Sequence, residues 1–333
     1  MMWAMHPSQA LFEEGPAAPS LPVVDHYCGV EARMKKSLEL QAQMGPVFDI
    51  TLDCEDGAPI GGEAEHIELV LQMLASPDNR FGRVGVRVHA PSQATFEADI
   101  DALVARAGER MAYLMVPKPR DAAELNRACD FIDASLARHG IQHALPVHTL
   151  IETHGALRDV QQIAAHPRIE SLSFGLMDFV SAHRGAIPRS AMGMGPHGQF
   201  DHPLVVRAKL DIAAAAHAHG KTPSHCVVTE FRDERALQSA AERAAREFGY
   251  TRMWSIHPAQ IQPILDAFAP SSAEVDDAIE ILHAAQAAQW APIRHRDTLH
   301  DRASYRYFWQ LIERAHRTGQ PLPEAVLADW FAD

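Results

Sequence analysis

Residues 145–179 read LPVHTLIETHGALRDVQQIAAHPRIESLSFGLMDF, and they contain the most informative pattern in the chain. Two short apolar runs, LPVHTLI and IESLSFG, flank a helix-like segment at 154–165, which is the pattern of a strand–helix–strand unit. Glu152 comes directly after the first predicted strand, and Asp178 stands shortly after the second. In a parallel barrel the carboxyl ends of the strands meet on one face, so we expect both carboxylates there.

Glu152 and Asp178 are candidate ligands of a metal ion. Two hard oxygen ligands on neighbouring strand ends, with room for water molecules, suit Mg²⁺. The alternative is that both acids lie on the surface and cap helices. The pair alone does not separate these interpretations, so the rest of the chain has to decide between them.

The composition is that of a globular protein. The chain has 333 residues, of which 47% are hydrophobic and 22% are charged, and such a chain can form one large barrel with an appendage or two ordinary domains. The net charge of −13 argues against non-specific nucleic-acid binding, which needs a basic surface. We therefore expect no nucleic-acid partner.

The cysteines and the apolar runs predict a cytoplasmic location. Four cysteines are widely spaced with no C-x-x-C pair: Cys28, Cys54, Cys129 and Cys226. Reduced thiols are therefore expected rather than disulfides or a zinc site. No run approaches 18 uncharged apolar residues, so no membrane span is expected. The first residues lack a basic region followed by an apolar core, so they are not expected to act as a signal peptide.

Short apolar runs rich in β-branched residues alternate with helical patterns along the chain. The predicted strands lie near residues 21–24, 47–53, 83–89, 112–117, 145–151, 169–175, 222–228 and 252–256. The predicted helices lie near residues 30–43, 63–75, 93–107, 121–138, 154–165, 201–219, 233–248 and 258–267. Eight such units in about 250 residues predict an α/β fold of the TIM (β/α)8 barrel type, with a doubly wound open sheet as the alternative.

Three segments are expected along the chain. An irregular arm is predicted at residues 1–19, which are rich in Pro and Ala. The barrel is predicted at residues 20–271, and a C-terminal helical extension outside it at residues 272–333. The extension contains six aromatic residues: Tyr305, Tyr307, Phe308, Trp309, Trp330 and Phe331. These are too many for a free solvated helix. We expect the extension to contact a neighbouring subunit, to cover the barrel mouth, or to pack on the barrel wall.

Further polar residues follow the predicted strands. They are Asp53, Glu55 and Asp56 after the second, Arg87 and His89 in the third, Lys118 after the fourth, Thr229 and Glu230 after the seventh, and His257 after the eighth. Arg87 lies inside an otherwise apolar strand, GVRVH, where an arginine is costly unless an anion pairs with it. It can pair internally with Asp53 or Glu55, hold an anionic substrate, or do both.

Seven motifs occur in order along the chain: DCEDGA (53–58), VRVH (86–89), VPK (116–118), IETHGAL (151–157), FGLMDF (174–179), FRDERAL (231–237) and SIHPAQI (255–261). Together they resemble the citrate lyase beta-subunit-like branch of the HpcH/HpaI aldolase superfamily, which includes malyl-CoA and citramalyl-CoA lyases. The resemblance covers roughly residues 45–270.

The resemblance implies a TIM barrel with Mg²⁺ held by Glu152 and Asp178. It implies that Arg87 and Glu152 contact the substrate, and that Arg87, Glu55 and Asp56 serve catalysis, the two acids by organising the site. The implied reaction is the reversible carbon–carbon cleavage of a β-hydroxyacyl thioester, usually of coenzyme A, into a keto acid and an acyl thioester. The general base stays open, with a water molecule or a residue of a neighbouring subunit as candidates.

The resemblance also implies a homo-oligomer, a trimer or a hexamer, whose C-terminal segment acts as a lid across subunits. Such a lid sometimes delivers a catalytic acid, for which Asp297 and Asp301 are the nearest candidates. The chain departs from the family pattern in three places. Its first predicted strand has no Arg-Ser, His89 stands where an asparagine is usual, and the loop at residues 182–203 is longer and richer in glycine than that of a minimal family member. Two alternatives therefore stay open, a metal-dependent aldolase that uses a free pyruvate-type donor, and a non-catalytic lyase-like subunit or acyl-binding protein.

Three other signals are weaker. Residues 193–198, GMGPHG, match G-x-G-x-x-G, but they do not directly follow a predicted strand and they contain Pro196. A lid over the metal or a subunit contact fits this loop better than a dinucleotide site. Lys118 suggests a Schiff base, but a structural or anion-pairing role is favoured between two prolines. The histidines lack the i, i+4 spacing of helical zinc ligands.

Overall fold

The structure is a computed structural model that describes residues 5–12, 21–58, 60–230 and 233–331. The chain divides into two compact units. One falls within residues 18–264, and the other combines the N-terminal residues up to 17 with residues 265–333.

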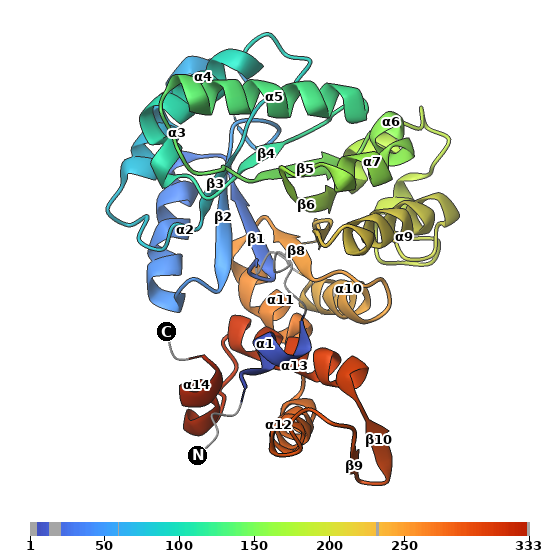
Figure 1. Ribbon diagram of the computed structural model, residues 1–333. Coiled ribbons are helices and arrows are strands. Elements are labelled where there is room, and N and C mark those ends of the chain that lie inside the picture. The colour runs from blue at the N-terminus through green and yellow to red at the C-terminus, as the bar shows by residue number, and fades with distance from the viewer. Residues whose placement is uncertain (1–4, 13–20, 59, 231–232, 332–333) are drawn as a thin grey trace. The chain divides into compact units, whose positions relative to one another are not determined.

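Eight parallel strands of the first unit close into a barrel in the order of the sequence, with β1 paired to both β2 and β8 (Figure 1). The strands are β1 (Val24–Cys28), β2 (Phe48–Asp53), β3 (Val84–Arg87), β4 (Leu114–Val116), β5 (Val147–Ile151), β6 (Ile169–Phe174), β7 (Thr222–His225) and β8 (Arg252–Ser255). The predicted TIM barrel is confirmed.

Helices surround the barrel. They are α2 (Glu31–Met44), α3 (Glu63–Ala75), α4 (Phe96–Ala107), α5 (Ala122–Arg138), α6 (His154–Arg158), α7 (Val160–Ala165), α8 (Leu176–Ser181), α9 (Pro203–Ala218), α10 (Glu234–Arg246) and α11 (Ile261–Phe268). Short 3₁₀ turns add η1 (Gly108–Arg110), η2 (Arg189–Met192) and η3 (Pro258–Gln260). The single helix predicted at 154–165 is two helices that meet at Asp159. Helix α8, which carries Asp178, was not predicted.

The first strand lies later in the chain than predicted. Residues 21–24 were expected to form it, but β1 extends over Val24–Cys28 and contains Asp25, which is fully buried. Arg252 of β8, also fully buried, lies 3.1 Å from Asp25 and 2.7 Å from Asp49 of β2. This ion cluster at the amino-terminal ends of the strands pairs the buried charges with one another, so a strand with a polar pattern is buried along its whole length.

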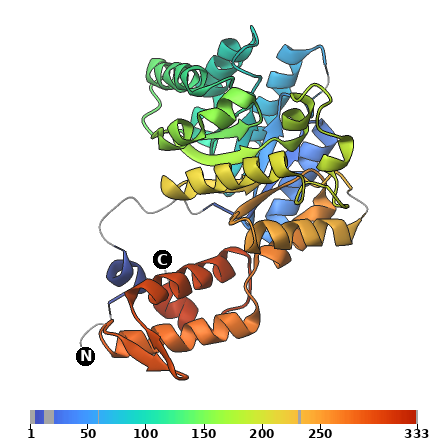
Figure 2. The same ribbon diagram turned by 90° about the vertical axis from the view of Figure 1, so that its right-hand side faces the viewer.

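The second unit has a core of its own. It contains α12 (Ser272–Ala287), α13 (Arg302–Arg317), α14 (Glu324–Trp330), the hairpin β9 (Ile293–His295) with β10 (Thr298–His300), and α1 (Pro7–Leu11). Helices α12 and α13 lie side by side, with the hairpin between them in the chain (Figure 2). Tyr305, Trp309 and Trp330 are buried in this core. Part of the aromatic surface that suggested a subunit contact is thus covered within the unit itself.

The N-terminal arm differs from the expected irregular segment. Residues Pro7–Leu11 form α1, which begins with a proline at its first position and receives a cap from the His6 side chain. Leu11 is buried in the core of the second unit, and α1 packs against α13. Burial of this apolar residue gives the short helix the tertiary support that it needs. None of the helices in the described part of the chain has the length and apolar character that a membrane crossing requires.

Candidate active site

The carboxyl ends of β5 and β6 bring Glu152 and Asp178 together, as the sequence predicted. Glu152 directly follows β5 and is buried, and its Oε1 accepts a hydrogen bond of 2.9 Å from the backbone N–H of Lys118. Asp178 lies in the first turn of α8, with its side chain 39% exposed. One carboxylate is therefore held in the barrel while the other faces partly toward solvent.

The electrostatics of Glu152 fit a cation site. Burial raises the pKa of Glu152 to about 8, and the negative charge of Asp178 adds to this rise. The positive charges of Arg87 and Lys118 act in the opposite direction but do not cancel it. Burial thus disfavours the charged form of Glu152 despite these two cations, and a divalent cation with a preference for oxygen ligands would favour that form.

Gly175 makes room for the Glu152 carboxylate. A Cβ atom at Gly175 would lie 2.0 Å from Oε2 of Glu152 and 2.5 Å from its Cβ. The glycine has an ordinary negative φ of −91°, so its requirement comes from close packing and not from backbone conformation. The residue between β6 and α8 thus sets the position of a carboxylate that follows β5.

We expect Gly175→Ala to weaken Mg²⁺ binding about 10- to 100-fold, the range found when groups that orient metal ligands are changed. The added methyl group must displace Glu152, and this overpacking should also lower the free energy of unfolding by about 1–3 kcal/mol. Isothermal titration with Mg²⁺ and chemical denaturation measure both effects. Gly195→Ala is the matched control, because a Cβ there has no atom within 4 Å. Equal Mg²⁺ affinity in both variants would contradict this assignment.

Arg87, the last residue of β3, is clamped by two acids. Its Nε donates to Asp53 Oδ1 at 2.7 Å and its Nη2 to Asp53 Oδ2 at 2.5 Å, while Nη1 lies 3.3 Å from Glu55 Oε2. The guanidinium lies over the ring of Tyr27 at 5.3 Å, and Tyr27 stacks on Trp254. Arg87 therefore pairs with both acids that the sequence predicted as partners. The ring of Tyr27, on one face of the guanidinium, fixes the orientation of the guanidinium plane.

Lys118 connects the acids on the two sides of the site. Its Nζ donates to Glu55 at 2.6 Å and to Asp56 at 2.7 Å, and it lies 3.6 Å from Asp178. Partial burial acts to lower the pKa of Lys118, but the hydrogen bonds to Asp56 and Glu55 outweigh it and raise the pKa. The amine therefore stays protonated. This agrees with anion pairing and disfavours a Schiff base, which needs a neutral amine.

Sequence reasoning missed several residues that shape the site. Tyr27 and Trp254, with Met115 and Leu150, form a buried cluster from four strands inside the barrel. Tyr27 was hidden because the first strand was predicted too early in the chain. His89, which follows β3, hydrogen-bonds Asp99 of α4 at 2.5 Å and is thereby tied to that helix.

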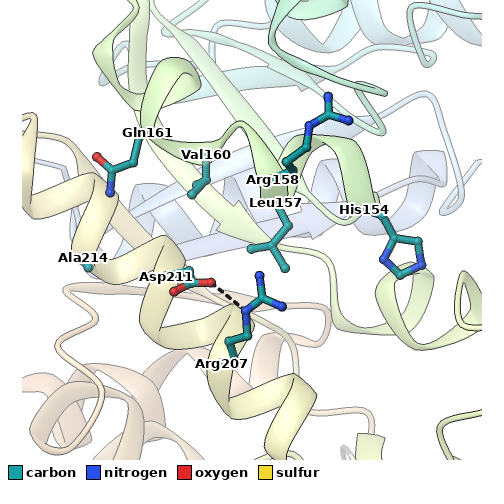
Figure 3. A pocket seen from close by; sticks show the side chains of 8 residues that line it. All are labelled: His154, Leu157, Arg158, Val160, Gln161, Arg207, Asp211 and Ala214. Carbon is teal, nitrogen blue, oxygen red and sulfur yellow. Dashed lines mark hydrogen bonds and ion pairs between the residues drawn. The ribbon is translucent and has the colours of Figure 1, made fainter.

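A separate cavity of about 400 Å³ lies on the outer wall between helices α6–α7 and α9 (Figure 3). Its two arginines are internally paired. Arg158 donates to Asp159 at 2.7 Å, and Arg207 donates to Asp211 at 3.2 Å. The positive charges of both arginines are thus balanced by acids on the same helices or at their ends. The cavity therefore gives no specific indication of a ligand.

A closed parallel barrel with carboxylates and an arginine at the carboxyl ends of its strands is characteristic of TIM-barrel enzymes. The HpcH/HpaI aldolase/citrate lyase family matches residues 47–258. The chain belongs to this family, and the resemblance drawn from the seven motifs is confirmed.

Solved structures and characterised proteins agree with this assignment. A citrate lyase from Burkholderia xenovorans LB400 is 54% identical, with 99% of this chain and 100% of that chain covered and a TM-score of 0.84. The L-malyl-CoA/beta-methylmalyl-CoA lyase of Cereibacter sphaeroides is 26% identical over 294 residues, which cover 84% of this chain and 89% of that protein. CitE from Mycobacterium tuberculosis, solved with magnesium, acetoacetate and coenzyme A, shares the fold at 21% identity and a TM-score of 0.67, with 89% of this chain and 98% of that chain covered. These relatives do not favour the two alternatives, the aldolase with a free donor and the non-catalytic protein.

Proposed function

We propose that the protein is a Mg²⁺-dependent carbon–carbon lyase that cleaves a β-hydroxyacyl thioester, as the coenzyme A ester, into a keto acid and an acyl thioester, or condenses the two. The observation that carries the proposal is the Glu152–Asp178 pair beside the fixed guanidinium of Arg87 at one end of a barrel of this family. The name of the Cereibacter relative, a lyase of malyl-CoA and beta-methylmalyl-CoA, supports the substrate class.

Glu152 and Asp178 would hold the metal ion. Their carboxylate oxygens are hard ligands, and a bound cation would stabilise the charged form of Glu152, which burial disfavours. Mg²⁺ bound there would act as a Lewis acid and template for the carboxylate and adjacent oxygen of the keto-acid half. Because the metal ion would hold the keto-acid half beside its ligands, Glu152 would also contact the substrate. The magnesium in the CitE complex supports the same choice of metal.

Arg87 would bind the substrate and stabilise the charge that develops in the reaction. Asp53 accepts from Nε and Nη2 of the guanidinium and Glu55 lies beside Nη1, so the side chain is held in one position. One N–H each of Nη1 and Nη2 remains for the substrate. When the carbon–carbon bond breaks, negative charge develops on the thioester half. A pre-positioned guanidinium stabilises such charge without reorganising.

Glu55 and Asp56 would organise the site through the two cations. Glu55 lies between Arg87 and Lys118, and Asp56 holds the other side of the Lys118 ammonium. This chain of ion pairs keeps Lys118 beside Glu152, to which its backbone N–H donates. The two acids thereby control the positions of the arginine and of one candidate metal ligand.

We further propose a cytoplasmic homo-oligomer, a trimer or a hexamer, in which residues of the second unit contact a neighbouring subunit. The four cysteines are free and buried, as is usual in a reducing compartment. Leu299 of β10 is 73% exposed and Tyr307 of α13 is 58% exposed, which supports an apolar contact in this unit. Of the two lid acids, Asp301 caps α13 and Asp297 pairs with Arg294.

The double variant Leu299→Glu/Tyr307→Glu is expected to dissociate the oligomer, because two charges would be buried in an apolar contact. Light scattering should then give a mass near the 36.7 kDa of one chain, with an unchanged circular dichroism spectrum. Thr298→Glu, at an exposed neighbouring position of β10, serves as the control and should keep the native mass. An unchanged mass in the double variant would show that these residues lie outside the subunit interface.

A further inference from the structure

A pocket of about 320 Å³ lies at the same end of the barrel as the candidate active site. It is lined by Met177, Arg189, Ser190, Met192, Gly193, Thr229 and Glu230. Met177 precedes Asp178 in α8, and Thr229 and Glu230 follow β7, the strand next to β6. The pocket therefore shares helix α8 with one of the two carboxylates proposed to bind the metal.

Arg189 is the cation of this pocket, and its charge is available. Its side chain is exposed, and it forms no ion pair or hydrogen bond with any residue in the described part of the chain. Arg87 at the site, and Arg158 and Arg207 in the outer cavity (Figure 3), are each paired with an acid. A free guanidinium offers a planar set of donors that matches a carboxylate in bidentate geometry.

The loop that carries Arg189 is fixed by buried contacts. The backbone N–H of Gln199 donates to Gly193 O at 2.9 Å, and the Gln199 side-chain amide donates to Met192 O at 3.3 Å. Gln199 accepts a hydrogen bond of 2.8 Å from the fully buried Nζ of Lys209, which lies over the ring of Phe200 at 3.6 Å. Gln199, which follows the Gly-rich loop at residues 193–198, thus holds the C-terminal end of η2 in place. The pocket is therefore formed before a ligand enters.

The remaining lining suits a short carbon chain that ends in a carboxylate. Met177 and Met192 provide adaptable apolar walls for methylene groups. The Thr229 hydroxyl donates to Glu230 at 3.2 Å, so this acid already has a partner within the pocket wall. Arg189 is the lining residue with a positive charge.

We propose that Arg189 is a specificity-determining residue that binds a second carboxylate on the keto-acid half of the substrate. This inference rests on the proposed function, because the keto acid is the half held at Asp178, next to the pocket. The protein should therefore prefer a dicarboxylic 2-oxo acid to a monocarboxylic one of the same length. A charge-assisted bidentate contact corresponds to a preference of about 10- to 100-fold.

Calorimetric titration of the full-length protein with keto acids in the presence of Mg²⁺ tests the role of Arg189 without turnover. Two matched pairs are compared, oxaloacetate with 2-oxobutyrate and 2-oxoglutarate with 2-oxopentanoate, which differ only in a terminal carboxylate or methyl group. The wild type should bind the dicarboxylic member of at least one pair about 10- to 100-fold more tightly. Arg189→Met should reduce that ratio to near one, and Arg189→Lys should retain part of it.

Arg184→Met is the matched control, because Arg184 is an exposed arginine of the same loop that does not line the pocket; its ratio should equal that of the wild type. An unchanged ratio in Arg189→Met, or no preference in the wild type for either pair, overturns the role of Arg189. Preference for the diacid without cleavage of any β-hydroxyacyl thioester refutes the lyase function and leaves the role of Arg189 intact. Cleavage without a preference refutes the role of Arg189 alone.

Discussion

Asp178→Asn and Glu152→Gln are each expected to lower Mg²⁺-dependent turnover about a thousandfold or more. A metal ion that acts as a Lewis acid contributes several kcal/mol to transition-state stabilisation, and each 1.36 kcal/mol corresponds to a factor of ten in rate. Both substitutions remove a charged ligand oxygen and preserve the shape of the side chain. The barrel should stay folded, because residues at the carboxyl ends of the strands contribute mainly to function.

Calorimetric titration with Mg²⁺, together with thermal unfolding of the metal-free proteins, separates loss of the metal from loss of the fold. The matched control is Glu234→Gln, an exposed acid in the first turn of α10, which should bind Mg²⁺ as the wild type does. If either site variant binds Mg²⁺ with unchanged affinity, that residue is not a metal ligand. In that case the alternative interpretation, that Glu152 and Asp178 only cap helices, would be favoured.

Arg87→Lys is expected to reduce kcat/KM about 100-fold although the positive charge is kept. Lysine replaces the planar fork on Asp53 by a single point charge, so one of the two charge-assisted hydrogen bonds from this side chain to the buried Asp53 is lost. A hydrogen bond to a charged group contributes about 1.5–3 kcal/mol, and the free energy of unfolding should fall by a similar amount. Steady-state kinetics and urea denaturation measure the two effects.

Arg83→Lys is the matched control for Arg87, because Arg83 precedes the same strand at its opposite end, where it lies 4.0 Å from Asp49. That variant should keep near-normal kinetics. Near-normal turnover in Arg87→Lys as well would mean that Arg87 is only an internal ion-pair partner of Asp53 and Glu55.

Most of the barrel could be predicted because buried parallel strands read as short apolar runs between helical patterns. The second strand, predicted at 47–53 and observed at Phe48–Asp53, shows this. The first strand was misplaced because Asp25 interrupts its apolar pattern. The burial of Asp25 depends on Arg252, more than 220 residues away in the chain, and on the hydroxyl groups of Thr51 and Tyr113, which donate to it. Such a long-range ion pair leaves no local signal in the sequence.

The candidate site could be predicted in part for a similar reason. Glu152, Asp178 and Arg87 stand at strand ends, and strand ends can be located along the sequence. The role of Gly175 could not be predicted, because it depends on how closely the turn after β6 approaches a carboxylate that follows β5. Arg189 was also missed, since its importance depends on a pocket formed by two separate loops and on the absence of a partner among the described residues.

Product analysis by mass spectrometry, after incubation with malyl-CoA, citramalyl-CoA or citryl-CoA, measures the proposed carbon–carbon cleavage directly; citryl-CoA is the member of this set that yields a dicarboxylic keto acid. With Mg²⁺ present, we expect an acyl-CoA and a keto acid in equal amounts, and removal of the metal with EDTA should stop their formation. The Asp178→Asn protein should form neither product at a comparable rate. Release of free coenzyme A without a keto acid, or cleavage at the same rate in EDTA, would contradict the assignment of a Mg²⁺-dependent carbon–carbon lyase.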